Sequence, residues 1–204
     1  MSLVEELIRD GWLRTPRLIE AFQKIERKDF MPEEVKGFSQ VNEAFPIGHG
    51  QTISQPSVVA FMLEQLQPKA GEKILDIGSG SGWTTALLAY IVGSKGRVIA
   101  IEIIPQLKEF GEKNVSKYNF LEKKIVKFVC GDGSKGFKEE APFDKILVSA
   151  SAKKIYSAWK KQLKIGGRIV SSVKFSIWRV EKKSETEFEE KEYPGFVFVP
   201  LVEK

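Results

Sequence analysis

Short, almost continuously apolar runs alternate with helical stretches through the last two-thirds of the chain. Apolar runs of this kind between helices are typical of strands that are buried on both faces of a parallel sheet. The runs cover residues 73–77, 97–103, 124–130, 144–150 and 168–173. The helical stretches between them cover residues 82–92, 105–118 and 153–163. This alternation predicts a doubly wound α/β fold around a mostly parallel sheet.

The two ends of the chain follow other patterns. At the N-terminal end we expect helices over 2–12 and 16–27, a loop rich in Gly, Pro, Asn and Ser from about Met31 to Pro56, and a helix beginning at Gln55–Pro56. At the C-terminal end we expect antiparallel strands over 176–182, 186–193 and 195–201. The chain is therefore predicted to be a single domain over 1–204, with a helical N-terminal extension over 1–70 and the α/β core over 71–204.

Composition excludes several classes of protein. With 42% hydrophobic and 29% charged residues the chain is globular rather than disordered. No window approaches the roughly 18 uncharged apolar residues of a membrane span, and the acidic start MSLVEELIRD is unlike a signal peptide. The single cysteine, Cys130, excludes an internal disulfide and suits a reducing cytoplasm, where we place the protein. We expect it to be a small apolar residue at a buried strand end. One histidine and one cysteine cannot form a His/Cys zinc site, and we expect no metal.

The charge balance leaves two interpretations open. The net charge is +5, and the widest acid-free basic stretch runs from Lys153 to Arg168. It is either the solvated face of a helix or a patch that binds nucleic acid. No arginine–aromatic interleaving accompanies the stretch, which favours the helix face.

A glycine-rich turn follows the first predicted core strand. It is Gly78-Ser79-Gly80-Ser81-Gly82, preceded by Asp76 and followed by Trp83 and a helix. Such a turn lets backbone approach a ligand closely and presents a helix N-terminus to it. Trp83 stands where a dinucleotide fingerprint needs its third glycine, which counts against NAD or FAD. The G-x-G-x-G spacing is similar to the first motif of S-adenosylmethionine-dependent methyltransferases, in which the loop wraps the amino-acid end of the cofactor.

That resemblance implies a Rossmann-like methyltransferase sheet and S-adenosyl-L-methionine as cofactor, with S-adenosyl-L-homocysteine as product. Glu102 ends the second core strand, where a carboxylate accepts hydrogen bonds from both ribose hydroxyls, although it is also readable as a solvated strand-end acid. Asp132 follows the third strand and is placed to meet the adenine amino group, although Asp-Gly is also a plain turn. The predicted cofactor-binding residues are Asp76, Gly78, Ser79, Gly80, Ser81, Gly82, Glu102, Asp132 and Gly133.

A longer match precedes the core. The segment from Phe45 to Ala60, FPIGHGQTISQPSVVA, closely resembles the signature of protein-L-isoaspartate O-methyltransferases. Further segments match that family in order: 27–32, 131–133, 141–144, 162–168 and 196–201. The resemblance covers residues 20–201, and the TISQP block is its specific part. The signature leaves the position of His49 variable, so we interpret His49 as a loop residue rather than an acid or base.

The family resemblance implies protein repair. A member methylates the α-carboxylate of L-isoaspartyl residues in damaged proteins or peptides, and a carboxylate acceptor needs no general base. The family's serine contact to the acceptor carboxylate corresponds to Ser54, our candidate catalytic residue. The other interpretation is that Ser54 only caps the helix that begins near Pro56. The predicted substrate-binding residues are Thr52, Ile53, Ser54, Val197 and Val199. We expect a monomer that binds neither membrane nor nucleic acid.

Two other functions remain open. The chain has Gln40, Asn42, Ala44 and Tyr156 where the family usually has tyrosine, aspartate, proline and proline. A paralogue that kept the cofactor and changed its acceptor, such as a tRNA adenine-type RNA methyltransferase, is one alternative. A protein that binds cofactor or damaged peptides without turnover is the other.

Overall fold

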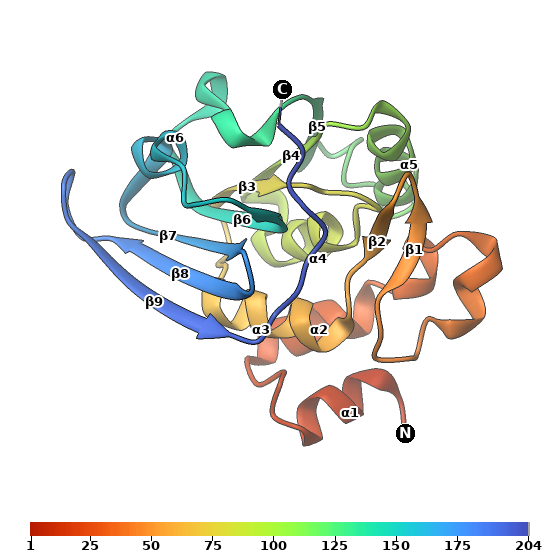
Figure 1. Ribbon diagram of the computed structural model, residues 1–204. Coiled ribbons are helices and arrows are strands. Elements are labelled where there is room, and N and C mark those ends of the chain that lie inside the picture. The colour runs from red at the N-terminus through yellow and green to blue at the C-terminus, as the bar shows by residue number, and fades with distance from the viewer. Residues whose placement is uncertain (204) are drawn as a thin grey trace.

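A seven-stranded sheet forms the centre of the computed structural model, which describes residues 1–203. The strands are β3 Lys73–Ile77, β4 Arg97–Glu102, β5 Val126–Cys130, β6 Phe143–Ala152, β7 Leu163–Val173, β8 Ser176–Lys182 and β9 Phe188–Pro194. Their order is β5-β4-β3-β6-β7-β8-β9. The pairs from β5 to β7 are parallel and the last two are antiparallel. The predicted sheet, mostly parallel with an antiparallel C-terminal edge, is confirmed (Figure 1).

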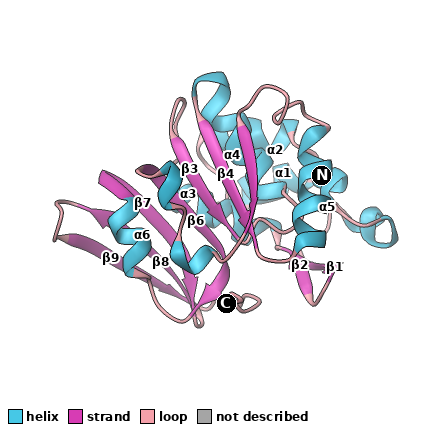
Figure 2. Ribbon diagram, turned by 90° about the horizontal axis from the view of Figure 1, so that it is seen from above, coloured by secondary structure: helices cyan, strands magenta, loops and turns pink. Residues whose placement is uncertain are grey.

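The helices cover the two faces of the sheet unequally. They are α1 Leu3–Arg9, α2 Pro16–Lys24, α3 Pro56–Leu66, α4 Trp83–Val92, α5 Pro105–Ser116 and α6 Ser157–Gln162. The apolar residues of α3, α4 and α5 share one core, whereas α6 contributes Trp159 to a second core on the other face (Figure 2). Alternate strand residues divide between the two, so Ile74 joins the first core and Leu75 the second. Proline at the first turn begins α2, α3 and α5, where its missing N–H costs no hydrogen bond.

The prediction of an irregular loop over Met31–Pro56 is wrong in part. After 3₁₀ turns at Arg27–Phe30 and Glu33–Phe38, the chain forms a hairpin of β1 Phe45–Gly48 and β2 Gln51–Ile53. The strands are only four and three residues long, which hides their alternation in the sequence. Positive φ at three successive residues, 48–50, reverses the chain, and glycine stands at two of them.

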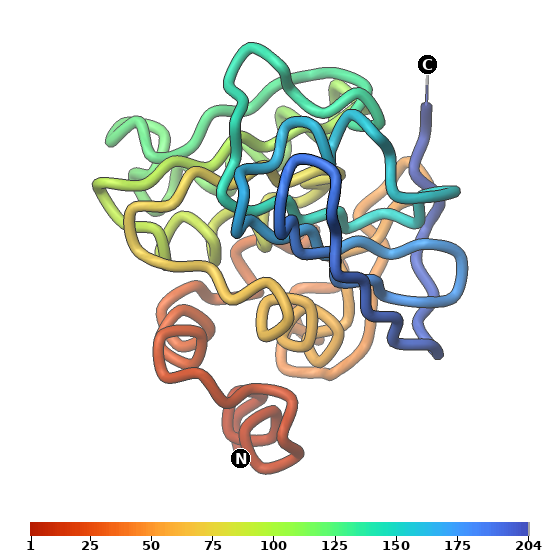
Figure 3. Tube along the Cα trace, turned by 90° about the vertical axis from the view of Figure 1, so that its left-hand side faces the viewer, coloured from red at the N-terminus to blue at the C-terminus, as the bar shows by residue number. Residues whose placement is uncertain are grey.

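The segment 195–201 is not the antiparallel strand that its sequence predicts. Gly195 has φ +97° and directs the chain away from β9 across the carboxyl ends of the strands. β3 pairs with β6 only as far as Val148, so the end of β6 extends beyond it with a free edge. There Ser151 donates to Val199 and accepts from Leu201, both at 2.8 Å, in one isolated parallel bridge. The two termini lie at opposite ends of the molecule (Figure 3).

Two smaller predictions need correction. The helix predicted over 153–163 shortens to α6, because β6 continues to Ala152 and the chain bends at residues 153–154 before the helix begins. Cys130 is exposed rather than buried, since it ends β5 at the outer edge of the sheet. No helix within residues 1–203 is long and apolar enough to cross a membrane.

Candidate functional site

The carboxyl ends of β3, β4, β5 and β6 border one cleft, which we call the carboxyl-edge cleft. β3 lies between β4 and β6 although it precedes both, so the strand order reverses here. Ligands of open α/β sheets bind at such a reversal. The cleft has an empty volume of about 730 Å³, open solvent included, and residues 51–54 and 199–202 form its opposite wall.

Most of the predicted site residues meet in this cleft. Those that line it are Thr52, Ile53, Ser54, Gly78, Ser79, Gly80, Ser81, Glu102, Gly133 and Val199. Asp76, Gly82, Asp132 and Val197 do not line it. Their assigned roles stay predictions, and the positions of these four residues show what each side chain does in the fold.

Gly82 gives helix α5 room to approach the glycine turn. Its φ is +84°, and a Cβ there would lie 2.9 Å from the carbonyl oxygen of Gly111 in α5. A Cβ on Gly111 would in turn lie 2.8 Å from the carbonyl oxygen of Gly80. Because neither glycine has a side chain, the backbone of α5 can pack directly against the backbone of the glycine turn. Gly111 is absent from the predicted site because nothing in its own helix marks it.

Glu102 holds two loops that border the cleft. Its Oε2 accepts from the N–H of Gly80 at 2.9 Å, and its Oε1 accepts from the N–H of Ile104 at 3.0 Å. Only 6% of the residue is exposed. Glu102 is thus a fixed, nearly buried carboxylate whose remaining lone pairs face the cleft, and the interpretation as a solvated strand-end acid is wrong.

Three buried polar groups in the wall of the cleft have no hydrogen-bond partner within residues 1–203. They are Ser79 Oγ, Trp83 Nε1 and Ser149 Oγ. Buried polar atoms are almost always hydrogen-bonded in folded proteins, so orphans gathered in one cleft indicate a polar ligand. The donors and acceptors, together with the volume, fit a nucleoside-containing ligand such as S-adenosylmethionine.

Asp76 is fully buried beneath the glycine turn. Its Oδ2 accepts from Thr85 Oγ1 at 2.6 Å, while its Oδ1 has no partner among the described residues. Burial is the main cause that raises the pKa of Asp76 to about 7, and the nearby charge of Glu102 adds to it. The sequence gives no sign of this burial, since Asp76 precedes the turn as a ligand-facing acid would.

We expect Asp76 to make the unliganded protein less stable as the pH rises from 5 to 8. A folded-state pKa raised above the unfolded value means that the folded protein binds the extra proton between about pH 4 and 7. The stabilisation is present below the unfolded pKa and is lost through the folded pKa, in total roughly 2–4 kcal/mol. Urea unfolding at pH 5 and pH 8 measures it, and Asp76→Asn should flatten the pH dependence by that amount. An equal pH slope in both proteins would contradict the assignment.

The side chain of Asp132 stabilises the turn in which it lies. Its Oδ1 accepts from the N–H of Ser134 at 2.9 Å, and Lys135 Nζ lies 3.5 Å from Oδ2. The neighbouring glycines, Gly131 and Gly133, line the cleft instead. The contact of Asp132 with adenine stays a prediction.

A second cavity adjoins the cleft, and we call it the Ser54 cavity. It has an empty volume of about 690 Å³, open solvent included. Thr52, Ser54, Ser149 and Val199 line both the cleft and this cavity, so they form a shared wall. The other lining residues are Ala44, Gln55, Val58, Val197 and Phe198. Val197 is 80% exposed and borders the cavity at its mouth.

Arg27 fixes the backbone of Ser54 from below. Its Nη2 donates to the carbonyls of Ser54 at 3.1 Å and Glu43 at 2.6 Å, and its Nη1 donates to that of Val41 at 2.9 Å. The residue is 4% exposed and has no carboxylate partner within residues 1–203. Burial lowers the pKa of Arg27 to about 10, so it stays charged at neutral pH. A buried cation therefore lies behind the Ser54 backbone, without lining the cavity itself, and its charge favours an anion there.

Ser54 does not cap α3. Gln55 is the N-cap residue and makes no capping hydrogen bond through its side chain. Asn42 Oδ1 accepts from the N–H of Ser57 at 2.9 Å and so satisfies the helix start from another segment. The Ser54 hydroxyl makes no hydrogen bond within the described part of the chain, which leaves it available to a ligand.

The other departures from the family pattern are mostly structural. Gln40 Oε1 accepts from the N–H of Leu3 at 3.1 Å, and the Tyr156 hydroxyl donates to Glu203 at 2.6 Å. Neither lines the cleft or the Ser54 cavity. Ala44 does line the Ser54 cavity, so among these positions it is the one that shapes the candidate acceptor site.

Comparison with known proteins decides the family. The profile described as Protein-L-isoaspartate(D-aspartate) O-methyltransferase (PCMT) matches residues 1–204. The chain belongs to this family. The prediction from the TISQP segment is thereby confirmed.

Two relatives match this chain over nearly its full length. A Methanopyrus kandleri protein-L-isoaspartate O-methyltransferase is 41% identical over 98% of this chain and 89% of its own. One from Pyrococcus abyssi is also 41% identical, over 98% of this chain and 92% of its own. A Plasmodium falciparum protein that is assigned to PCMT and was crystallised with S-adenosyl-L-homocysteine has the same fold, with a TM-score of 0.90 at 23% identity, over 99% of this chain and 97% of its own.

Several residues of this family member's site were not found from the sequence. Ser149 and Ala150 line the cleft at the end of β6, and Ile103 and Ile104 line it after β4. The rule that ligands bind at the carboxyl ends of strands beside a reversal of strand order would have indicated them. The family match over 27–32 marked Arg27 without indicating its role, because its contacts lie in segments distant in sequence.

Proposed function

We propose that this chain transfers a methyl group from S-adenosyl-L-methionine to the α-carboxylate of L-isoaspartyl residues in damaged proteins or peptides. The observation that carries the proposal is the shared wall of Thr52, Ser54, Ser149 and Val199. It places a nucleoside-sized cleft against a second cavity that opens to solvent at Val197. Donor and acceptor then meet across this wall, as a direct transfer requires.

The lining of the Ser54 cavity favours a carboxylate acceptor. No Asp, Glu, His, Lys or Tyr lines it, and His49 lies exposed at the hairpin tip. A hydroxyl or amine acceptor must lose a proton, whereas a carboxylate is already deprotonated at neutral pH. S-adenosylmethionine supplies a methyl group activated by its sulfonium. The acceptor therefore needs orientation and exclusion of water more than a base.

The chain's own groups supply that orientation. The free hydroxyl of Ser54 and the orphaned hydroxyl of Ser149 donate to the acceptor carboxylate, and the Arg27 charge beneath Ser54 favours the anion. Val58 and Val199 exclude water from the wall. Thr52, in the shared wall, contacts the acceptor segment, whereas Ile53 is buried and supports the wall from the side of the carboxyl-edge cleft.

The donor is held by the carboxyl-edge cleft. Glu102 accepts from the ribose hydroxyls, and the glycine turn contacts the amino-acid end of the donor. We give the remaining residues the following roles: Asp76 and Gly82 support the turn from below, and Asp132 and Gly133 border the adenine, with Gly133 the one of the two that lines the cleft.

A nucleic-acid acceptor fits this chain less well. The basic stretch 153–168 is largely neutralised, since Lys153, Lys160, Lys164 and Arg168 each pair with a carboxylate. It therefore presents no continuous positive face to phosphates. A monomeric state and a cytoplasmic location stay predictions.

Transfer of labelled methyl to an isoaspartyl peptide, beside its normal aspartyl twin, tests the proposal. Label on the isoaspartyl peptide alone, released as methanol by mild alkali, is the expected result and identifies a carboxyl methyl ester. Cofactor binding without transfer would favour the non-catalytic alternative. Transfer to transfer RNA but not to peptide would overturn the proposal in favour of the changed acceptor.

Ser54→Ala should lower kcat/KM for the isoaspartyl peptide by about 10- to 100-fold, because one charge-assisted hydrogen bond is worth about 1.5–3 kcal/mol. Affinity for S-adenosylhomocysteine should stay within about twofold, since the hydroxyl faces the acceptor side of the wall. Steady-state kinetics and calorimetry measure the two effects. Ser116→Ala, at an exposed serine that ends α5, is the matched control. Equal losses of transfer and affinity would mean that Ser54 is structural.

A further inference from the structure

The turn between β7 and β8 breaks the local rules of hairpins. Val173 pairs with Ser176, so Lys174 and Phe175 form a two-residue loop. Lys174 has φ +55°, a conformation that such loops normally give to Gly, Asn or Asp. Phe175 is 71% exposed at the tip. Residues that break local rules without a structural benefit are expected at functional positions.

A third cavity, which we call the Lys174 cavity, lies against this turn. It has an empty volume of about 1020 Å³, open solvent included. Its apolar side chains include Ile155, Val173 and Phe175, with Trp178 beside them. Four lysines and two glutamates also line it, which leaves a net charge of 4 − 2 = +2.

Two of these lysines have no carboxylate partner within residues 1–203. Lys153 and Lys160 pair with glutamates, and Glu192 accepts from the Ser176 hydroxyl. Lys154 lies over the ring of Tyr156, 5.9 Å from its centroid, and Lys174 forms no ion pair. Both lysines are exposed. The cavity thus presents two ammonium groups without an ion pair, against one such carboxylate, Glu192, beside exposed aromatic surface.

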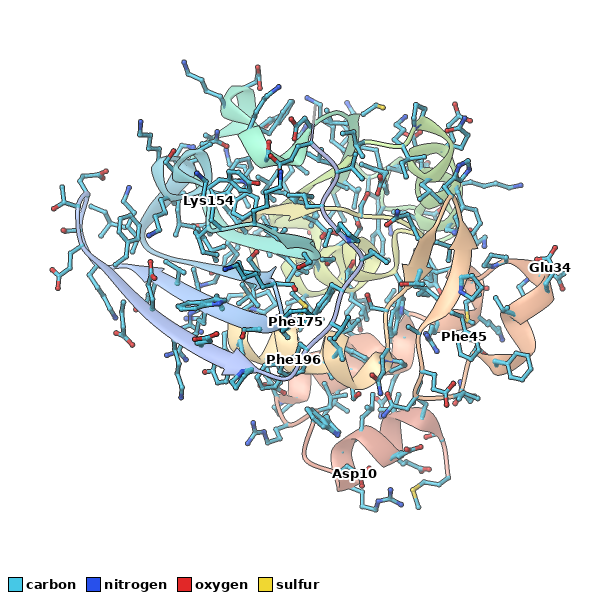
Figure 4. The ribbon with its side chains drawn as sticks, viewed as in Figure 1. Asp10, Glu34, Phe45, Lys154, Phe175 and Phe196 are labelled. Atoms are coloured by element: carbon cyan, nitrogen blue, oxygen red, sulfur yellow. The ribbon has the colours of Figure 1, made fainter. Side chains whose placement is uncertain are left out.

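Backbone hydrogen bonds link the turn beside the Lys174 cavity to the segment that enters the Ser54 cavity. The carbonyl of Phe175 accepts from the N–H groups of Gly195 and Phe196 at 2.9 and 3.0 Å. The next residues, Val197–Val199, line the Ser54 cavity. Phe175 and Phe196 lie side by side, and Lys154 lies beyond them toward α6 (Figure 4). A polypeptide whose reacting residue occupies the Ser54 cavity can therefore continue past Phe196 toward Lys154 and Lys174.

We propose that Lys154, Lys174 and Phe175 form a docking subsite for acidic residues that flank the reacting residue of the acceptor polypeptide. The inference rests on the proposed function, because it takes a polypeptide as the acceptor. The two ammonium groups attract the flanking carboxylates, and Phe175 with Trp178 covers their aliphatic stems. The subsite is exposed to solvent, so its contribution falls as salt screens the charges.

Isoaspartyl peptides that differ only in their flanks test the subsite. One series has two Glu residues placed two to five positions from the isoaspartyl residue on either side, and the twin series has Gln there. At low salt we expect kcat/KM of the better Glu peptide to exceed that of its Gln twin by about fivefold, mainly through a lower KM. This ratio corresponds to about 1 kcal/mol, as for exposed charge pairs. The preference should shrink at 0.5 M salt.

The double variant Lys154→Gln/Lys174→Gln should reduce that ratio to about one, whereas Lys154→Arg/Lys174→Arg should retain it. Lys123→Gln/Lys138→Gln is the matched control, since both lysines are exposed, have no ion pair within residues 1–203 and lie away from this turn. An acidic preference that survives in the Gln double variant, or that the control also loses, would overturn the subsite. Equal rates of wild type on both series would overturn it too, whereas no methylation of any isoaspartyl peptide would instead contradict the proposed function.

Discussion

Glu102→Ala should weaken binding of S-adenosylhomocysteine by about 100-fold, the largest effect on affinity that we expect from one side chain. The carboxylate makes hydrogen bonds to the N–H groups of Gly80 and Ile104, and its free lone pairs are proposed to accept from the ribose hydroxyls. Hydrogen bonds to a charged group contribute about 1.5–3 kcal/mol each, and two lost ribose contacts correspond to at least a 100-fold change. Alanine also removes the hydrogen bonds that fix the loops at Gly80 and Ile104, so these loops must be ordered when the ligand binds, which costs conformational entropy.

Calorimetry with the product nucleoside measures this loss without turnover. Glu102→Gln keeps the shape but places an amide NH₂ against one backbone N–H, so we expect an intermediate loss of about tenfold. Glu109→Ala, at an exposed acid of α5 with no hydrogen bond within residues 1–203, is the matched control and should bind as wild type does. A Kd for Glu102→Ala within threefold of the wild-type value would remove Glu102 from the donor site.

Gly111→Ala should lower the free energy of unfolding by about 2 kcal/mol, although alanine is the better helix former. In an exposed helix the same change stabilises by about 1 kcal/mol. Here the new Cβ would lie 2.8 Å from the carbonyl oxygen of Gly80 and 3.2 Å from the ring of Phe128. The first obstacle is backbone and cannot rotate away, so α5 or the glycine turn must shift, and such overpacking costs about 1–3 kcal/mol.

The displaced turn should also weaken S-adenosylhomocysteine binding by about tenfold or more, because a shift of about 1 Å misplaces its backbone groups. Urea unfolding and calorimetry measure the two effects. Lys113→Ala is the control in the same helix, at an exposed position without a side-chain hydrogen bond in the described residues, and should be neutral or slightly stabilising. A stabilised Gly111→Ala would show that the crossing of α5 over the turn is looser than its geometry indicates.

The sheet and the donor site were largely predictable, because their signals are local. Buried parallel strands read as apolar runs, and each of the five predicted core strands is present with its boundaries shifted mainly at β6 and β7. The glycine turn and Glu102 follow strand ends that the topology brings to one edge. The TISQP segment indicated the family, which the full-length match confirms.

The failures have a common origin in contacts that cross the chain. The segment 195–201 has the composition of a strand, yet β3 ends at Ile77, opposite Val148, and only the end of β6 beyond Val148 is free to pair with the segment. The hairpin at 45–53 has strands of only four and three residues and is anchored by Ile47 and Ile53, which are buried in the main core. The sequence left a helix cap open as the second interpretation of Ser54, and only the structure shows that Asn42, twelve residues earlier, satisfies the helix start instead.

The sequence by itself determined the order of strands and helices, the glycine turn, the strand-end carboxylate and the family, since each depends on neighbours within a few residues. Only the tertiary structure decided that Asp76 is a buried support, that α5 approaches the turn at Gly111, and that Arg27 holds Ser54 from below. It alone placed Val199, and not Val197, in the wall between the two cavities. The physical reason is that burial, close approach and shared walls arise from packing between distant segments, which local periodicity does not record.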